Sequence, residues 1–170
     1  MATGKHVGAT LKRVLVRMAT LATLVLLGFY VLFYFAQTGM VFHGERQLRQ
    51  DPGAFGWDFE DVLLPVRGDT THGWFVPLEN ARGLIFFCHG NDGNVSTRLG
   101  TIRHFRSLGF STLIYDYGGF GRSTGRPSEK RVHADTWAMW NHLVETRGLR
   151  AGPPGGSCSR RVGKHLHVHG

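Results

Sequence analysis

An uncharged apolar run near the start of the sequence limits most strongly what this chain can fold into. The run from Met18 to Ala36 has 19 residues without a charged side chain. As a helix it would be about 28 Å long, close to the ~30 Å hydrocarbon core of a bilayer. A helix also pairs its backbone polar groups internally, as lipid requires. The run therefore predicts a transmembrane helix over residues 18–36, with the lipid bilayer as its partner.

A cleaved signal peptide and a buried core helix are the two alternatives to a membrane span. The run exceeds the roughly 7–15 apolar residues of a signal peptide, and no small-x-small cleavage site follows Ala36. A core helix would carry more polar residues than Thr20 and Thr23. The sequence therefore favours the membrane span over both.

The charges on either side of this run predict its orientation. Residues 1–17 carry four basic residues and no acidic ones, whereas Arg46 and Arg49 are offset by Glu45 and Asp51. The positive-inside rule places a basic flank in the cytoplasm. We therefore expect a cytoplasmic N-terminus and a periplasmic or otherwise extracytoplasmic remainder.

The formal net charge of +8 comes from the two ends of the chain. Residues 150–170 carry four more basic residues, while twelve basic and twelve acidic residues balance between residues 18 and 149. A nucleic-acid-binding domain concentrates positive charge on its folded part. The neutral body therefore indicates no nucleic-acid partner.

The pattern changes after the apolar run. Residues 37–56 are rich in glycine and polar residues and predict a linker with little packing of its own. Residues 57–66 alternate, a turn follows at 67–70, and residues 72–78 read as a second strand. Two such runs around a tight turn predict a β-hairpin.

Strands and helices are then expected to alternate. The apolar run 83–88 is typical of a strand buried on both faces. After it, apolar residues at helical spacing predict a helix with Ser96 as its N-cap and Gly109 at its end; they are Leu99, Ile102, Phe105 and Leu108.

A further strand is expected at residues 110–117, followed by a helix that Ser128 can cap. The buried stripe of this helix would comprise Val132, Thr136, Met139, Trp140 and Leu143. Strand and helix in alternation predict an α/β fold with a parallel sheet.

The segment Gly121 to Gly125 reads GRSTG and matches the G-x-S-x-G pattern of a serine hydrolase nucleophile. That serine must sit on a sharp turn directly between a strand and a helix. The strand here ends near Asp116, and Arg126 and Pro127 still precede the helix. We therefore predict that Ser123 belongs to a glycine-rich turn and that its hydroxyl bonds local backbone.

Three motifs together resemble the α/β-hydrolase superfamily: HGWFVP at 72–77, LIFFCHGNDGN at 84–94 and LIYDYGGFGRSTGRPSE at 113–129. They are most similar to a branch with one N-terminal membrane span, related to serine-aminopeptidase-like and acyl-thioesterase-like hydrolases. The resemblance covers residues 37–149. It implies a transmembrane helix followed by a partial α/β-hydrolase sheet of about four strands and two helices.

The resemblance also implies roles for two loops. The first would be the oxyanion-hole loop, formed by His89, Gly90 and Asn91. The second would shape the site without supplying a nucleophile; its residues are Asp116, Tyr117, Gly118, Gly119, Gly121 and Ser123. In the family the nucleophile follows on a fifth strand, and an Asp and a His come later, so no catalytic residue is identifiable in this chain.

The composition changes abruptly after residue 149, where the fifth strand would begin. Residues 150–170 are rich in Gly, Pro and basic residues, as a disordered tail, an out-of-frame reading or a genuine short tail would be. His165, His167 and His169 alternate there, but without a further ligand they predict no metal site. We expect no cofactor. Cys88 is expected to be a small buried side chain, and a disulfide with Cys158 is possible by count alone.

The sequence thus predicts a basic segment 1–17, a membrane helix 18–36, a linker 37–56, a partial hydrolase domain 57–149 and an unrelated tail 150–170. The family activity would be hydrolysis of an ester, thioester or amide in a small acyl or peptide substrate. This chain itself would be an inactive N-terminal fragment, and the alternative is a non-catalytic membrane-anchored binding or interaction module. His104, His133 and His142 are expected to be ordinary helix residues.

Overall fold

The computed structural model describes residues 3–147 and divides into two compact units. The first unit ends at Val41 and the second begins at Phe42.

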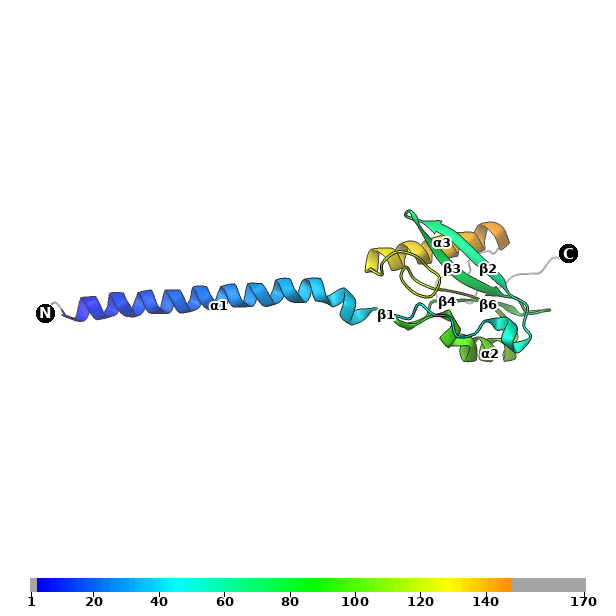
Figure 1. Cartoon of the computed structure of the whole chain (residues 1–170), viewed down its shortest axis with the longest axis horizontal. Helices are drawn as coiled ribbons and strands as arrows, with labels where there is room; N and C mark the ends of the chain where they lie inside the picture. The colour runs from blue at the N-terminus through cyan, green and yellow to red at the C-terminus, as the bar shows by residue number, and fades with distance from the viewer. Residues whose placement is uncertain (1–2, 148–170) are drawn as a thin grey trace. The chain divides into compact units, whose positions relative to one another are not determined.

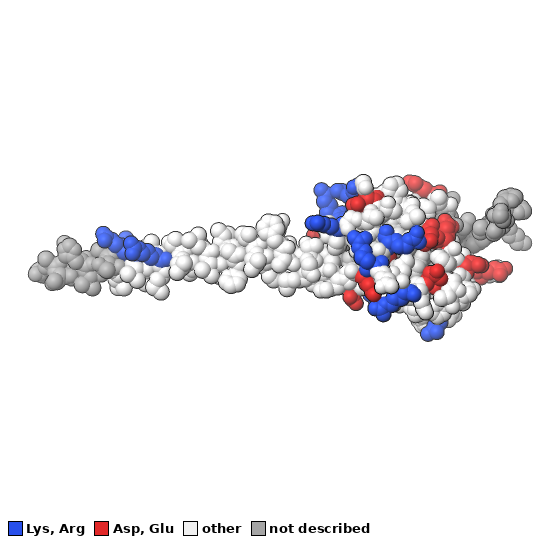
Figure 2. Space-filling view, in the orientation of Figure 1, with Lys and Arg blue, Asp and Glu red and all other residues white. Residues whose placement is uncertain are grey.

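The first unit is a single helix, α1, which spans Thr3–Val41. Among the described residues this is the one helix whose length and composition would suit a membrane span, over Leu11–Val41. The large apolar side chains of that stretch are exposed. The hydroxyls of Thr20 and Thr23 each donate to a backbone carbonyl one turn earlier, at 2.9 Å. The two polar side chains within the apolar run are therefore satisfied inside the helix. Figure 2 shows basic side chains near the start of α1 and none of either sign along the stretch that follows.

The second unit is built on a mixed four-stranded sheet in the order β2-β3-β6-β4. Strands β2 (Glu60–Val66) and β3 (Asp69–Val76) are antiparallel, and β3 is antiparallel to β6 (Phe110–Tyr115). Strand β4 (Gly83–Phe87) is parallel to β6 and lies at the edge of the sheet. The expected parallel pairing therefore holds for β4 and β6, while the hairpin makes the sheet mixed.

The hairpin turn is tighter than the sequence pattern indicates. Only Arg67 and Gly68 lie between the strands, with φ angles of 52° and 85°. Two consecutive residues with positive φ are typical of a type I′ turn, whose twist matches that of the flanking strands. Thr70, expected in the turn, pairs with Pro65 instead.

Helices α2 (Leu99–Ser107) and α3 (Glu129–Arg147) cover opposite faces of the sheet (Figure 1). Alternate residues of β6 supply both cores, because Leu113 and Tyr115 face α3 whereas Ile114 faces α2. The core beneath α3 includes Val62, Met139 and Leu143, and the core beneath α2 includes Trp74, Val76, Leu99 and Ile102.

The start of the α2 region differs from the expectation that Ser96 is its N-cap. A 3-10 helix, η2 (Val95–Arg98), precedes α2, and its N-cap is Asn94. The Asn94 side chain accepts a hydrogen bond from the Ser96 backbone N–H at 3.0 Å. Asn94 takes this place because its extended backbone lets the side chain reach back over the first turn.

The other two predicted helix ends agree with the structure. Gly109 has a φ of 86° and follows the last turn of α2. A left-handed residue at this place favours glycine. The Ser128 hydroxyl accepts from the Arg131 N–H at 3.2 Å at the start of α3.

Residues 37–56 pack more closely than a linker would. Helix α1 continues to Val41, and β1 (His43–Gly44) then pairs in parallel with β5 (Asp92–Gly93). The Asn94 side chain donates to the carbonyls of Glu45 at 3.0 Å and Gln47 at 2.8 Å. A 3-10 helix, η1 (Pro52–Phe55), follows. Much of the segment belongs to the second unit because the domain satisfies its backbone groups.

Strand β4 and the residue after it are less buried than the apolar run predicts. Residues 84–87 are half-buried, because within residues 3–147 β4 has a partner strand on one side only. Cys88 lies beyond the strand and is exposed, which contradicts the expectation of a buried side chain. It is a free cysteine, and Cys158 lies outside the described residues.

Candidate functional site

Two loops meet where the adjacent parallel strands β4 and β6 end. The loop after β4 carries His89, and the loop after β6 carries Tyr117, whose hydroxyl donates to the His89 carbonyl at 2.6 Å. Burial, with the nearby Cys88, raises the pKa of Tyr117 to about 12, so the phenol remains a hydrogen-bond donor at neutral pH. In an open α/β sheet, ligands bind outside the carboxyl ends of the strands, which makes this edge the candidate site.

Ser123 is fully buried in the loop after β6. Its hydroxyl donates to the Asp116 carbonyl at 2.7 Å and accepts from the His72 backbone N–H at 2.8 Å. Both partners are backbone groups, and together they fasten the loop to β3. The hydroxyl therefore stabilises the turn in this structure.

Asp116 ties the two loops to each other. Its side chain is fully buried, and Oδ1 accepts from the Val95 backbone N–H at 2.9 Å. Gly121, with a φ of 45°, passes so close to Asp116 Oδ2 that a Cβ atom at this position would collide with the oxygen. Glycine is required here for both backbone conformation and space.

A set of hydrogen-bonded polar side chains connects the loop after β6 to the β2–β3 hairpin. His72 Nε2 lies 2.7 Å from Asp61 Oδ1, and Arg122 Nη1 lies 3.0 Å from Asp61 Oδ2. Burial raises the pKa of Asp61, but the hydrogen bonds from His72 and Arg122 outweigh it and lower the pKa below its ordinary value. Asp61 is therefore ionised at neutral pH and accepts the hydrogen bonds from His72 and Arg122.

A buried arginine joins the other end of the loop to α3 and β3. Arg131 Nε lies 2.8 Å from Asp135 Oδ1, and Arg131 Nη1 lies 2.7 Å from Asp69 Oδ2. Asp135 Oδ2 accepts from the Gly118 backbone N–H at 2.8 Å, and Thr71 donates to its other oxygen. The loop after β6 is thus fixed from both sides, as a preformed site requires.

The predicted oxyanion-hole loop has one buried and two exposed members. The His89 side chain points into the protein, whereas Gly90 and Asn91 lie at the surface. The Asn91 carbonyl accepts from the His43 N–H at 2.8 Å, which connects this loop to β1. Backbone N–H groups at a rigid, accessible turn are the donors that a developing oxyanion needs.

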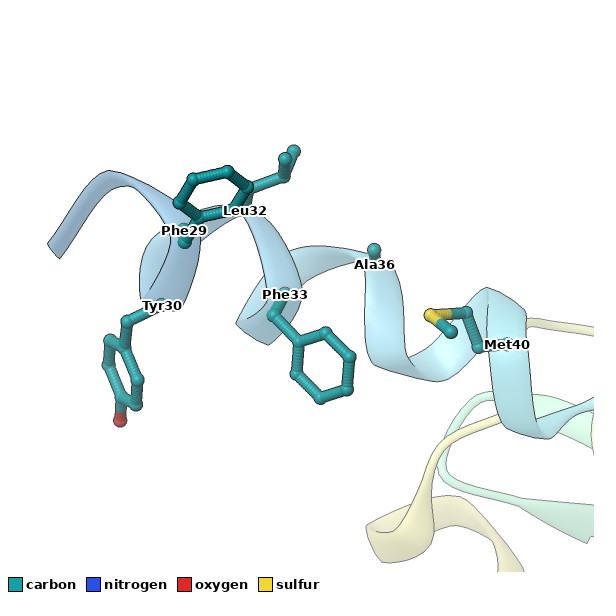
Figure 3. Close-up of a pocket in the computed structure, with 6 residues that line it drawn as sticks. All are labelled: Phe29, Tyr30, Leu32, Phe33, Ala36 and Met40. Carbon is teal, nitrogen blue, oxygen red and sulfur yellow. The ribbon is translucent and has the colours of Figure 1, made fainter. Parts of the chain in front are cut away.

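A shallow apolar hollow lies along α1 (Figure 3). All of its lining residues belong to that one helix: Phe29, Tyr30, Leu32, Phe33, Ala36 and Met40. It lacks the convergent polar groups of a reaction site.

Within residues 3–147, no group of three or more His, Cys, Asp or Glu side chains is arranged to hold a metal ion. His165, His167 and His169 lie outside the described residues. His104 and His133 are exposed on α2 and α3, and His142 is half-buried on α3.

Sequence reasoning singled out the two loops but missed the side chains that hold them. His72, Asp61 and Arg131 lie in segments assigned to a strand or a helix on apolar pattern alone. One signal in the sequence could have identified them: each is a charged or polar residue at a position that the apolar pattern assigns to the protein interior.

The sheet order, the two covering helices and the two loops define the N-terminal part of an α/β-hydrolase fold, as the three sequence motifs predict. The chain resembles an α/β-hydrolase from Vibrio vulnificus, with a TM-score of 0.50 and 24% identity, over 56% of this chain and 33% of that one. It also resembles a Pyrococcus furiosus esterase, with a TM-score of 0.53 and 17% identity, over 62% and 42%.

The chain is also similar in sequence to two relatives. Protein bem46 of Schizosaccharomyces pombe is 32% identical over 139 residues, which are 75% of this chain and 46% of that protein. Uncharacterized protein YfhR of Escherichia coli K12 is 33% identical over 91 residues, covering 50% and 32%. The chain thus spans less than half the length of these relatives. No family model matches it.

Proposed function

We propose that this chain is the N-terminal part of a membrane-anchored α/β-hydrolase and that it has no hydrolase activity by itself. The absence of hydrolase activity is inferred from the environment of Ser123, the serine of the GRSTG motif. Its side chain is fully buried and hydrogen-bonded to backbone groups.

Acyl-serine chemistry requires a serine hydroxyl that a base can deprotonate and a carbonyl can approach. The Ser123 proton is directed at the Asp116 carbonyl, which cannot act as the base. To attack a substrate, the side chain would have to break two hydrogen bonds and leave the protein interior. That rearrangement would also remove one of the hydrogen bonds between the loop and β3.

In the longer enzyme, the loop after β4 would contribute to the oxyanion hole and the loop after β6 would shape the site. The rigid connections of both loops support these roles, as does the position of both at the carboxyl ends of parallel strands. The substrate class would be an ester, thioester or amide with a small acyl or peptide group. The resemblance to an esterase is consistent with this class.

Helix α1 would anchor the protein in a lipid bilayer through Met18 to Ala36, with the basic segment in the cytoplasm and the hydrolase part on the other side. Its length, its apolar composition and its exposed side chains support this role. On the face of the second unit shown in Figure 2, basic and acidic side chains are interspersed, which does not favour nucleic acid as a partner.

A fluorophosphonate probe tests the absence of activity. We expect the full chain in detergent micelles to remain unlabelled under conditions that label a known serine hydrolase in the same detergent. Ser123→Ala and Ser128→Ala serve as matched variants, because Ser128 is the half-buried cap of α3 in the same segment. Labelling that disappears in Ser123→Ala but persists in Ser128→Ala would refute the proposal and make GRSTG a working site.

A further inference from the structure

Three buried polar side chains converge beneath the two loops of the candidate site. They are His72 from β3, His89 from the loop after β4, and Asp116 from the loop after β6, and none of the three side chains is exposed. Asp116 lies between the two imidazoles, with Oδ1 3.3 Å from His89 Nε2 and Oδ2 3.8 Å from His72 Nδ1.

The outer nitrogen of each imidazole must carry a hydrogen. His89 Nδ1 lies 2.7 Å from the Gly90 carbonyl, which can only accept, so Nδ1 donates. His72 Nε2 lies 2.7 Å from the Asp61 carboxylate and donates to it. If both rings were neutral, each would therefore turn a lone pair towards Asp116.

With both imidazoles neutral and Asp116 ionised, the buried acceptor atoms of the three side chains have too few hydrogens between them. The Val95 N–H donates to Asp116 Oδ1 at 2.9 Å. His72 Nδ1, His89 Nε2 and Asp116 Oδ2 are all buried without a hydrogen-bond partner, since the His89–Asp116 contact is close enough for an ion pair but not aligned as a hydrogen bond. Lone pairs facing an ionised carboxylate in the protein interior are strongly unfavourable.

We propose that this cluster holds one additional proton, on Nε2 of His89, and that the resulting imidazolium–carboxylate pair with Asp116 latches the loop after β4 to the loop after β6. The pair would be a charge-assisted contact between segments that are distant in sequence but adjacent at the end of the sheet.

The surroundings favour His89 over the other two groups as the site of the proton. Its nitrogen is closer to Asp116 than that of His72, and the Val95 N–H bond favours the ionised form of Asp116. The rings of Tyr117 and Phe120 lie against the His89 ring, with centroids 4.9 and 5.9 Å away. Aromatic rings attract a neighbouring cation.

The other titratable groups around the cluster either have partners of their own or are neutral. Asp61, from β2, contacts His72 on the side away from Asp116 and is itself paired with Arg122. Tyr117 remains a neutral phenol. Asp116 is therefore the carboxylate that faces His89. This inference does not depend on the proposed hydrolase role, because it concerns the folded chain alone.

Nitrogen-detected NMR of the histidine rings tests the proposal directly. The full chain, labelled with ¹⁵N-histidine, is studied in detergent micelles at pH 7.5, and His72→Gln and His89→Gln assign the signals. We expect both ring nitrogens of His89 to be protonated in the wild type. In Asp116→Asn, His89 should revert to the neutral form with a proton on Nδ1 only.

Asp135→Asn is the matched control, since it also removes a buried carboxylate but one that binds Arg131. It should leave the His89 signals unchanged. A neutral His89 in the wild type would overturn the proposal, as would a doubly protonated His89 in Asp116→Asn. A ring that titrates as in the urea-unfolded chain would also overturn it. If Asp116→Asn fails to fold, the wild-type spectrum alone decides.

Amide hydrogen exchange of residues 89–95 gives a second readout of the latch. We expect exchange in Asp116→Asn to be roughly tenfold faster than in the wild type, because the loop after β4 loses its ion pair with the loop after β6. Asp135→Asn should accelerate exchange in this segment no more than it does elsewhere in the second unit. Equal acceleration in both variants would point to general destabilisation and would count against a specific latch.

Discussion

At the scale of single residues, Arg131 is a buried charged side chain with partners on two elements. Its guanidinium is buried and bridges Asp135 on its own helix and Asp69 on β3. Asp135 in turn binds the Gly118 N–H, so one arginine connects α3, the sheet and the loop after β6. Removing one partner of such a buried pair leaves an uncompensated charge inside the protein.

We expect Arg131→Met to destabilise the second unit by roughly 3–5 kcal/mol, because Asp135 loses its cation. Arg122→Gln is the control: its exposed pair with Asp61 should contribute no more than about 1 kcal/mol. Denaturant unfolding of the full chain in micelles, followed by tryptophan fluorescence, measures both. If both variants lost the same free energy of unfolding, the buried Arg131 network would not be a principal contributor to the stability of the second unit.

Asp61 should make stability depend on pH on the acid side. Its pKa in the folded protein is below the ordinary value of 3.8, so its stabilising effect is present above about pH 4 and is lost as the pH falls through the folded value. In Asp61→Asn, the unfolding midpoint should fall less between pH 6 and pH 3 than in the wild type. Asp58→Asn, an exposed neighbour, should retain the wild-type slope. Parallel profiles for Asp61→Asn and the wild type would contradict this.

At the scale of secondary structure elements, β4 is the vulnerable part of the sheet. It is an edge strand among the described residues, it carries no charge or proline, and residues 84–87 are half-buried apolar side chains. Edge strands of this kind are templates for pairing with other chains. In the family resemblance, a fifth strand lies along this edge.

We expect residues 37–170, produced without the anchor helix, to be insoluble or molten. Each large apolar side chain left in water forfeits roughly 1.5–3 kcal/mol. A domain's stability is only about 5–15 kcal/mol, so a few such exposures are enough to remove it. Size-exclusion chromatography and amide NMR dispersion measure the outcome.

A monomer with dispersed amide signals and a cooperative unfolding transition would contradict this expectation. It would show that the exposed edge of β4 is covered or paired in another way. It would also favour a self-sufficient binding or interaction module over a part of a longer enzyme.

At the scale of the whole molecule, the chain joins an apolar helix to a charged α/β unit. We predict that α1 makes the protein integral to the membrane and leaves the second unit on the non-cytoplasmic side. Alkaline carbonate should therefore fail to extract the full chain from membranes. Protease added outside intact spheroplasts should digest the second unit.

Three substitutions at once, Leu24→Glu, Leu27→Glu and Val31→Glu, provide the control for the anchor. Charged groups within a span are costly in hydrocarbon, so this variant should be extracted by carbonate. Extraction of the wild-type chain would refute the anchor. Protection of its second unit from external protease would refute the orientation.

The sequence by itself determined the features that depend on local pattern. The 19-residue uncharged run, a hairpin with its turn within residues 67–70, and the strand–helix alternation follow from periodicity and turn chemistry. The distance of Ser123 from any strand–helix turn was also readable, because only chain order is needed to see it.

The tertiary structure alone decided which side chains meet. Asn94 became the cap because its amide also binds the carbonyls of residues 45 and 47, and the expected linker packed for the same reason. Asp116 lies between His72 and His89 because β3 and β4 flank β6 in the sheet, an order that no local pattern encodes. Cys88 is exposed because it lies past the end of β4, which has one neighbouring strand among the described residues. Contacts between distant residues depend on strand order and register, and these are settled only when the sheet assembles.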